Sequence, residues 1–509
     1  MAAARPVWRP PAALWVLLGL AALVFVHEMQ PARLEGHWRL ITPVVVLCGV
    51  LVLRWLWEQP PAVTLCAAIA LTVFSGGWSQ MGFGNLPLNR LLVLAAILQV
   101  FLRSPGSAHL PPIRVRGVHL LMAATLLYAV ASAAAAAELG NEVEYLLLID
   151  VFGLTPFLIF LIAPVVFAGE RERDWLLATL VGLGAYLGLT AVFEALGPHS
   201  LVFPSYIRHL EFESATEVAA EAKAAGPFQA PVAMGFACFA SAVAGVIALR
   251  RWRRPWPRRL AGAVALLCLF GCLLTLERGV WIATAAGILA AALATQSGRR
   301  WLLPGIALGA IAITGAFALS PQLQHRVSER ATYQQSLWDR KNQTATGIRM
   351  VEARPLFGFG FGRYDDESLD YFRQSPDYPM TGYYHGITIG AFTDVLPIHN
   401  TYLAYGVELG LVGLALWLVS LLWAVGGAVL AHGPPALRPW KVGLLAIAAF
   451  FLVVSVVDPH TAPFPMVVLF AWAGLAWGPG PEPQLQPLRV PSGWTPAPTP
   501  TPTPASGAV

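Results

Sequence analysis

The chain has little charge for its length. Lys, Arg, Asp and Glu make up 12% of its 509 residues, whereas hydrophobic residues make up 57%. A soluble globular domain carries about 25% charged residues. The composition therefore excludes a soluble enzyme and predicts an all-α polytopic membrane protein, because helices satisfy their own backbone hydrogen bonds inside a bilayer.

Cysteine is scarce and absent from the predicted loops. All of the cysteines lie in apolar runs: Cys48, Cys66, Cys238, Cys268 and Cys272. This excludes a disulfide framework and a thiolate metal site in the loops. The sequence also lacks His-Glu-x-x-His and Asp-x-Asp motifs. We therefore expect no bound metal ion and no cofactor, and we interpret the cysteines as small buried hydrophobes.

The formal net charge of +5 does not indicate a nucleic-acid partner. The arginines are concentrated in short loops between apolar runs, as in the stretch 250–259, rather than spread over one face. These loops alternate with acidic or mixed ones such as 138–144. By the positive-inside rule the arginine-rich loops are cytoplasmic, and both termini are then cytoplasmic too.

Apolar runs long enough to cross a bilayer recur along the chain, and we count about fourteen. The run 88–102 is short, and the run 402–431 is long enough to tilt or to extend from the membrane. Two runs could be re-entrant, so about twelve spans remain possible. The predicted spans are 12–27, 40–56, 61–78, 88–102, 117–137, 146–168, 174–196, 229–249, 260–276, 279–295, 301–319, 402–431, 440–457 and 463–477.

This pattern divides the chain into four parts. Residues 1–319 hold the first eleven spans, with a non-cytoplasmic loop at about 197–228. Residues 320–398 form one large non-cytoplasmic loop, and residues 399–477 hold the last three spans. The tail 478–509 is Pro/Thr-rich, and we expect it to be disordered because it cannot build a core.

The large loop has three parts of different composition. Residues 322–352 are rich in charge and amide groups and are predicted to be helical. Residues 355–362 read Pro-Leu-Phe-Gly-Phe-Gly-Phe-Gly, which predicts a flexible apolar hinge. Residues 365–394 are aromatic, and we expect them to be irregular.

Two candidate residues, each with a polar neighbour, stand on the non-cytoplasmic side of the predicted spans. Arg278, next to Glu277, lies in a turn between two predicted spans on the non-cytoplasmic side. It is either an interfacial arginine paired with Glu277 or a guanidinium that binds a phosphate. His399, followed by Asn400, stands at the start of an apolar helix. It is either an interfacial histidine or a general base that Asn400 orients.

Further candidates lie in the large loop and in the last non-cytoplasmic turn. Arg340 and Arg349 both fall in the predicted loop helix just before the glycine-rich segment, and spacing alone does not choose between them. Asp458 lies in the short turn before the last span. It either joins the same site or caps a helix.

Together these motifs resemble the O-antigen ligase/O-antigen polymerase superfamily of bacterial membrane glycosyltransferases. Residues 275–281 resemble the family's Thr-x-Ser-Arg-Gly-x-Trp turn, and Arg340 ahead of 355–360 resembles its loop arginine before Pro-Leu-x-Gly-x-Gly. Residues 399–410 resemble its His-Asn-x-x-Leu…Glu-x-Gly segment. A weaker match at 225–231 extends the resemblance over about residues 220 to 425.

The resemblance implies a mechanism. The donor is an undecaprenyl-diphosphate-linked glycan, Arg278 and Arg340 (with Arg349 as substitute) bind its diphosphate, and His399 takes the proton of the acceptor hydroxyl. The family's reaction inverts the anomeric carbon and needs neither a metal ion nor a nucleotide. The sequence departs from the family at Glu277, where serine is usual, and at Lys223, where arginine is usual.

Several functions are compatible with these motifs. We expect an O-antigen ligase acting in lipopolysaccharide biosynthesis, with lipid A-core as acceptor. A polysaccharide polymerase would use the same groups on another lipid-linked repeat. A lipid-linked sugar transporter or flippase is the alternative of another class, but the predicted spans contain few polar residues and no internal repeat. We expect the protein in the bacterial inner membrane, among membrane lipids, with its active site facing the periplasm.

Overall fold

The structure is a computed structural model. It describes residues 51, 54–75, 77, 88–209, 223–319, 321, 324–325, 327–328, 335–373, 375, 377, 398–457 and 462–478. The predicted span 12–27, most of the predicted span 40–56 and the Pro/Thr-rich tail lie outside these residues.

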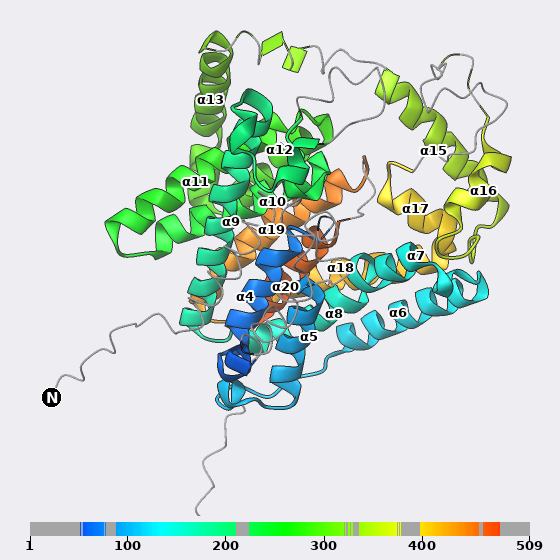
Figure 1. Ribbon diagram of the computed structural model, residues 1–509, viewed down its shortest axis with the longest axis horizontal. Helices are drawn as coiled ribbons and strands as arrows, with labels where there is room; N and C mark the ends of the chain where they lie inside the picture. Colours follow the sequence, from blue (N-terminus) through cyan, green and yellow to red (C-terminus); the bar gives the residue numbers. More distant parts are fainter. Residues whose placement is uncertain are drawn as a thin grey trace, which may run out of the picture.

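Helices form the regular structure throughout the described residues, where no strand occurs, and this confirms the predicted all-α class (Figure 1). The helices are α4 (Pro61–Thr72), α5 (Leu88–Phe101), α6 (Gly117–Ala135), α7 (Glu142–Leu147), α8 (Leu154–Val166), α9 (Glu170–Leu196), α10 (Pro231–Arg251), α11 (Pro255–Leu274), α12 (Arg278–Leu293), α13 (Gln296–Leu319), α15 (Gln335–Ala353), α16 (Tyr364–Tyr371), α17 (Thr401–Glu408), α18 (Gly410–Leu430), α19 (Arg438–Val454) and α20 (Pro463–Trp477).

In the described part of the chain, 7 helical segments are long and apolar enough to cross a membrane. One of them, Val143–Val166, joins α7 to α8 through a π-helical turn at Leu148–Phe152. Helices α4, α5, α12 and α20 are shorter apolar helices. The protein is therefore a polytopic membrane protein, and the count of about 12 to 14 spans stays a prediction.

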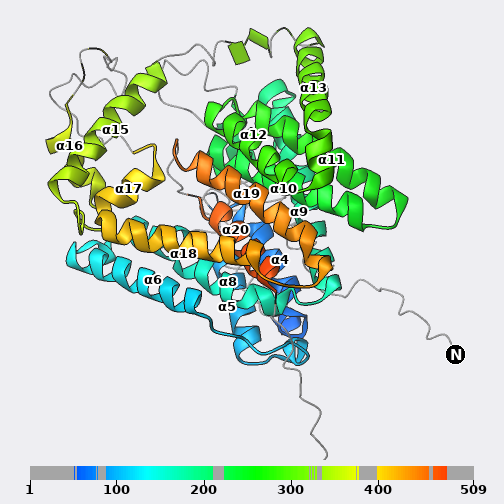
Figure 2. The ribbon, with the colours of Figure 1, turned by 180° about the vertical axis from the view of Figure 1, so that it is seen from behind.

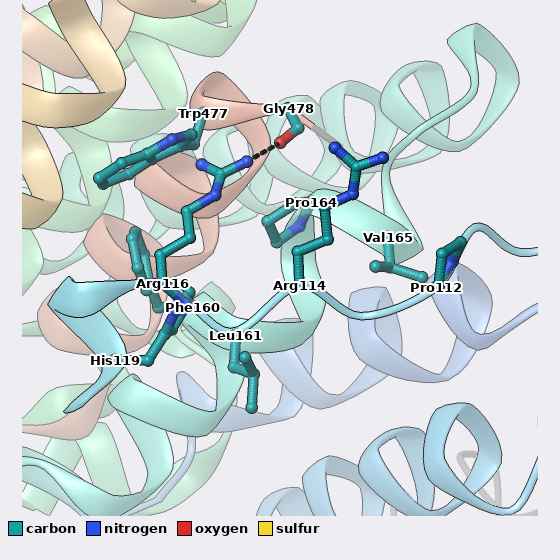
Figure 3. Close-up of a pocket in the computed structure, with 10 residues that line it drawn as sticks. All are labelled: Pro112, Arg114, Arg116, His119, Phe160, Leu161, Pro164, Val165, Trp477 and Gly478. Atoms are coloured by element: carbon teal, nitrogen blue, oxygen red, sulfur yellow. Dashed lines mark hydrogen bonds between the residues drawn. The ribbon is translucent and has the colours of Figure 1, made fainter. Parts of the chain in front are cut away.

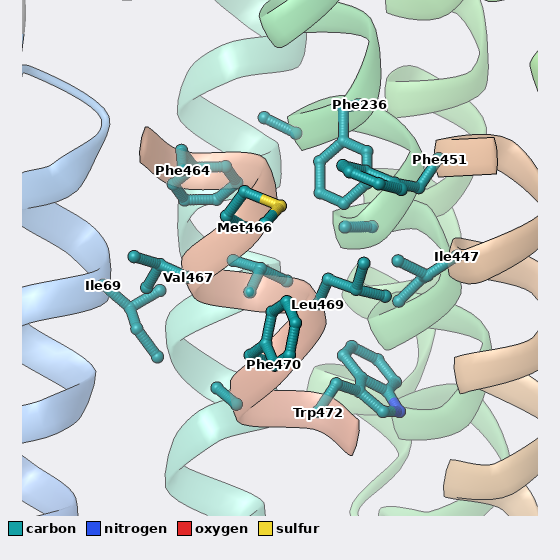
Figure 4. Packing of buried hydrophobic residues seen from close by; sticks show 14 of the residues in the cluster. Ile69, Phe236, Ile447, Phe451, Phe464, Met466, Val467, Leu469, Phe470 and Trp472 are labelled. Atoms are coloured by element: carbon teal, nitrogen blue, oxygen red, sulfur yellow. The ribbon is translucent and has the colours of Figure 1, made fainter. Parts of the chain in front are cut away.

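Helix α20 forms the centre of the bundle (Figure 4). Every residue from Phe464 to Ala476 is buried. The helix packs against α4, α8, α10, α18 and α19. A helix that is apolar on all sides belongs inside a bundle, because no face of it benefits from water. The described cysteines are also buried and free, as expected of small hydrophobes.

An arginine closes the far end of this central helix (Figure 3). The Arg116 guanidinium lies 4.9 Å from the ring centroid of Trp477 and donates a hydrogen bond of 3.3 Å to the Gly478 carbonyl. A cation at a helix C-terminus stabilises the carbonyl groups that have no partner within the helix. One arginine of a loop predicted to be cytoplasmic thus also holds α20 in place.

Helices α15, α16 and α17 gather at one end of the molecule, away from α9 and α11 (Figures 1 and 2). We call α15, residues 354–363, α16, residues 398–400 and α17 the loop unit. Its small core consists of the side chains of Met350, Phe359, Tyr364, Ile398 and Val407. Helix α15 confirms part of the helical stretch predicted at 322–352. The prediction of an irregular stretch from 365 was wrong at its start, because α16 occupies residues 364–371.

The apolar run 402–431 is not one helix, which corrects the prediction of a single long span. It breaks after Leu409, so that α17 belongs to the loop unit and the candidate span begins at Gly410. Gly410 has φ of +68°, a backbone conformation that glycine adopts without steric cost. The Tyr128 hydroxyl donates a hydrogen bond of 2.8 Å to the Leu409 carbonyl, which fastens the break to α6.

The prediction that residues 355–362 form a flexible hinge was also wrong. This segment is docked on the break between α17 and α18. The N–H groups of Phe359 and Gly360 donate to the carbonyls of Val407 and Glu408, each at 2.9 Å, and the Leu411 N–H donates to the Pro355 carbonyl at 2.8 Å. The segment thus satisfies backbone groups that helix ends leave without partners.

Candidate functional site

The turn between α11 and α12 is shaped by the residues of the motif at 275–281. The Thr275 hydroxyl donates to the Cys272 carbonyl at 2.8 Å, and the Trp281 indole N–H donates to the Leu273 carbonyl at 3.1 Å. A Cβ at Gly279 would lie 2.4 Å from Val457 Cγ2, so glycine allows α12 to approach the end of α19. These contacts place half-buried Arg278 at the first position of α12.

Glu277 joins three segments that are far apart in the sequence. Its side chain is 10% exposed, and its carboxylate lies 2.8 Å from Lys223 Nζ and 3.9 Å from a terminal guanidinium nitrogen of Arg340. A nearly buried carboxylate needs cationic partners to remain charged. The structure therefore brings together Glu277 and Arg340 beside Arg278, and it adds Lys223 to them.

Helix α15 connects this charged cluster to the predicted histidine. Arg340 and Gln343 are three residues apart and so lie on the same face of α15. Gln343 Oε1 lies 3.0 Å from His399 Nδ1, and Gln343 is 2% exposed. An amide oxygen accepts hydrogen bonds and has no hydrogen to donate. In the tautomer with the hydrogen on Nδ1, His399 donates to Gln343 Oε1, and Nε2 is the nitrogen that can accept a proton.

The start of α17 holds His399 in place. Asn400 is the N-cap of this helix, and its side-chain oxygen accepts the Leu403 N–H at 3.0 Å. The Thr401 N–H donates to the Ser455 carbonyl at the end of α19 at 2.8 Å. Capping by asparagine stabilises a helix start. Asn400 thus acts on the backbone of α17, and the ends of α17 and α19 are joined directly.

The two loop arginines point to different neighbours. Arg349 Nε donates to the Tyr371 carbonyl at 3.0 Å, and a terminal nitrogen donates to the Arg373 carbonyl at 3.4 Å. Arg349 comes nine residues after Arg340, about two and a half turns, so the two side chains leave opposite faces of α15. Arg340 reaches the turn between α11 and α12, whereas Arg349 holds the end of α16.

The predicted candidate Asp458 lies outside the described residues. The other predicted residues, Glu277, Arg278, Arg340, Arg349, His399 and Asn400, are all described.

One family model matches this part of the chain. Residues 263–418 match the family described as O-antigen ligase. This match supports the resemblance to the O-antigen ligase/polymerase superfamily. The family consists of glycosyltransferase-like enzymes, and it implies lipid-linked glycan substrates. No curated protein matches the chain.

The matched region of this O-antigen ligase family runs from α11 into α18. It therefore contains Glu277, Arg278 and His399, and also Arg340 on α15. It also contains the docked segment 355–362. Lys223 lies outside the matched region, although its ammonium group touches Glu277 within it.

Two residues near the candidate site were missed from the sequence. Gln343 was detectable only by its spacing of three residues from Arg340, and that spacing does not show which face of α15 meets His399. Glu194 accepts the N–H groups of Ala225 and Gly226 at 3.0 to 3.2 Å, and so holds the turn that follows Lys223. An acidic residue near the end of an apolar span was a usable signal for it.

A separate carboxyl group lies under the docked segment. Glu408 accepts hydrogen bonds from the backbone N–H groups of Gly362 and Tyr364. Burial, and then the nearby carboxylate of Glu144, raises the pKa of Glu408 to about 8. Glu408 is therefore largely protonated near neutral pH. Its contacts lie within the loop unit and help to hold that unit in position.

Proposed function

We propose that this protein transfers a glycan from undecaprenyl diphosphate to an acceptor hydroxyl, as an O-antigen ligase with lipid A-core as acceptor. One observation carries the proposal: α15 touches Glu277 through Arg340 and His399 through Gln343, within one turn. This arrangement supports the proposal, because glycosyl transfer from a diphosphate requires cations and a general base close together.

The cations serve the leaving group. Arg278, Arg340 and Lys223 bind the two phosphates of the donor and stabilise the negative charge that grows as the glycosidic C–O bond breaks. In this proposal guanidinium and ammonium groups supply the positive charge that a metal ion supplies in other transferases. The diphosphate leaves on its undecaprenyl chain.

The histidine serves the acceptor. His399 Nε2 takes the proton of the acceptor hydroxyl while its oxygen forms a bond to the anomeric carbon. The attack comes from the side opposite the leaving diphosphate, so the configuration of the anomeric carbon inverts. Gln343 orients the imidazole by accepting the hydrogen of Nδ1.

Glu277 organises the cations before the donor binds. It neutralises part of the charge of Lys223 and Arg340 and so keeps the two side chains over the turn between α11 and α12. The diphosphate competes with the Glu277 carboxylate for these cations. We expect this competition to weaken donor binding relative to a neutral residue at position 277.

Complementation of a deletion strain tests the proposal. We expect wild type and Arg349→Ala to restore the ladder of surface glycans on a gel, and His399→Ala and Arg340→Ala to abolish it at equal protein levels. Arg349→Ala is the matched control, because it removes an equal charge from the same helix. A normal ladder in both His399→Ala and Arg340→Ala would contradict the proposed roles.

The same gel identifies the acceptor. Loss of a ligase leaves core alone, with glycan accumulating on the lipid carrier. Loss of a polymerase leaves a single repeat on the core, and this result would replace lipid A-core by another lipid-linked repeat as acceptor. Protease treatment of intact spheroplasts carrying an epitope in the large loop tests whether the site faces the periplasm of the inner membrane.

A further inference from the structure

A hollow of about 450 Å³ lies between α10, α12 and α19. Ligand sites in proteins have volumes of about 300–1,000 Å³, so the hollow is large enough for a small molecule or one hydrocarbon chain. Its walls are mainly apolar, formed by residues such as Phe239, Val246, Ile288 and Ala291. The three helices lie next to one another in the bundle (Figures 1 and 2).

This hollow and the candidate functional site lie at opposite ends of the same helices. Helix α12 begins with Arg278 in the site, and residues of its second half line the hollow, followed by Thr295 just beyond the helix end. Helix α19 runs in the opposite direction. Arg438 at its start lines the hollow, and the carbonyl of Ser455, just after its end, accepts a hydrogen bond from the Thr401 N–H of α17. The hollow is therefore separate from the site where we propose glycosyl transfer.

Two cations line this mainly apolar hollow. Arg250, at the end of α10, and Arg438, at the start of α19, are both exposed. No carboxylate is among the described residues that line the hollow. The two arginines belong to loops that the positive-inside rule assigns to the cytoplasm, so they stand at the level of the lipid headgroups.

The hollow is accessible from the side of the bundle. Val246 on α10 is 42% exposed and Ile288 on α12 is 45% exposed, although both line the hollow. Apolar side chains exposed on a membrane-spanning helix face lipid rather than water. A lipid chain can therefore enter between α10 and α12 without passing through the protein.

From these features we infer that the hollow is a binding site for an anionic phospholipid of the cytoplasmic leaflet. One acyl chain lies against Phe239, Val246 and Ile288, and the phosphate lies between Arg250 and Arg438. The occupant must have both an apolar chain and an anionic group, because the lining has an apolar part and a cationic end. This inference does not depend on the proposed glycosyl transfer.

The test uses the full chain purified in detergent and reconstituted in vesicles of phosphatidylcholine, with or without phosphatidylglycerol. We compare wild type with Arg250→Gln/Arg438→Gln. Each arginine near the surface contributes to the attraction of an anionic lipid, so we expect the double variant to retain phosphatidylglycerol at least about tenfold less well. Retained lipid is measured by native mass spectrometry, and the increase in Tm with phosphatidylglycerol is measured in the vesicles.

The matched control is Arg253→Gln/Arg254→Gln. These arginines are exposed in the same loop as Arg250 but do not line the hollow. Retention like wild type in this control, with loss in Arg250→Gln/Arg438→Gln, supports the site. Equal loss in both double variants means a general charge effect and overturns it, as does unchanged retention in Arg250→Gln/Arg438→Gln.

A second variant tests the apolar part. Ala291→Trp places a large ring in the hollow without changing charge, and we expect it to release phosphatidylglycerol while leaving both arginines in place. Glycerol phosphate should not displace the lipid, because it lacks the chain. Full displacement by glycerol phosphate, or normal lipid retention in a folded Ala291→Trp protein, would overturn the inference.

Discussion

The bundle around α20 and the loop unit hold together by different physical means. In α20 thirteen consecutive residues, 464–476, are buried and apolar, so many similar contacts share the stabilisation. The loop unit depends on a few individual contacts: the bridge from Glu277 to Arg340, the bond from Gln343 to His399 and the backbone bonds of 355–362. We therefore expect a single substitution in the bundle to lower its stability without changing the arrangement of its helices. A single substitution at one of the contacts of the loop unit should displace that unit.

The largest expected effect on stability is in the bundle. Trp472 is 1% exposed and its indole N–H donates to the Trp440 carbonyl at 2.9 Å. Trp472→Ala should reduce the free energy of unfolding by about 3–5 kcal/mol, through lost contacts and the cavity left behind. Thermal unfolding in detergent measures this loss, and the protein that remains folded should transfer glycan normally.

Trp256→Ala is the control, because Trp256 is 74% exposed. Its effect on stability should stay within about 0.5 kcal/mol. If Trp472→Ala abolished transfer without lowering Tm, the distinction between the bundle and the loop unit would fail.

A glycine tests the docking of the loop unit. Gly358 has φ of +69°, and a Cβ there would lie 2.4 Å from the Glu408 carbonyl oxygen. Gly358→Ala should cost about 1–3 kcal/mol in local strain and release residues 355–362 from α17 and α18. We expect faster hydrogen exchange at Phe359 and Gly360 and a large loss of transfer, with little change in the Tm of the bundle.

Gly426→Ala provides the matched control for that substitution. Gly426 lies within α18, and a Cβ there would have no atom within 4 Å. Alanine is favoured over glycine inside a helix by about 1 kcal/mol, so this variant should be neutral or slightly stabilised. Equal exchange rates at Phe359 in Gly358→Ala and Gly426→Ala would show that the docking does not need glycine.

We expect Gln343 to affect the rate of glycan transfer and the pH dependence of that rate. Gln343→Leu removes the acceptor for His399 Nδ1–H, and we expect transfer to slow about tenfold through loss of orientation. Gln343→Glu places a carboxylate there, which favours the charged imidazolium. The acid limb of its pH–rate profile should therefore move to higher pH, since the base must be neutral to accept a proton.

Profiles of Gln343→Leu and Gln343→Glu that both match wild type in rate and pH dependence would count against His399 as the base. Both variants keep α15 helical, and purified protein with lipid-linked glycan as donor provides the assay.

The smallest expected effect concerns pH and stability. The pKa of Glu408 is raised from 4.5 to about 8 in the folded protein, first by burial and then by Glu144. The folded state therefore binds the proton more tightly than the unfolded state, and stability falls as pH rises from about 4.5 to about 8. In Glu408→Gln this fall should be reduced, as measured by Tm at a series of pH values. A fall as steep as in wild type would assign the pH dependence to other groups.

Several of the spans were predictable, because length and apolar composition are local properties. The predicted runs 117–137, 174–196 and 229–249 correspond to α6, α9 and α10. The break at Gly410 and the docking of 355–362 were not predictable, since each depends on a partner distant in the sequence. A glycine-rich segment is compatible with a hinge or with a tight approach of two backbones. Only the hydrogen bonds to the carbonyls of Val407 and Glu408 show that it is a tight approach.

The choice between Arg340 and Arg349 shows the same limit. The sequence by itself determined that the protein is a helical membrane protein and that both arginines precede a glycine-rich segment. Helical periodicity also separates their two faces. Only the tertiary structure decided that Arg340 meets Glu277 and that Gln343 meets His399. The physical reason is that a local pattern specifies which residues share a face of a helix but not what that face contacts. Here the contacts come from Glu277 and His399, which lie more than fifty residues from Arg340 and Gln343 in the sequence.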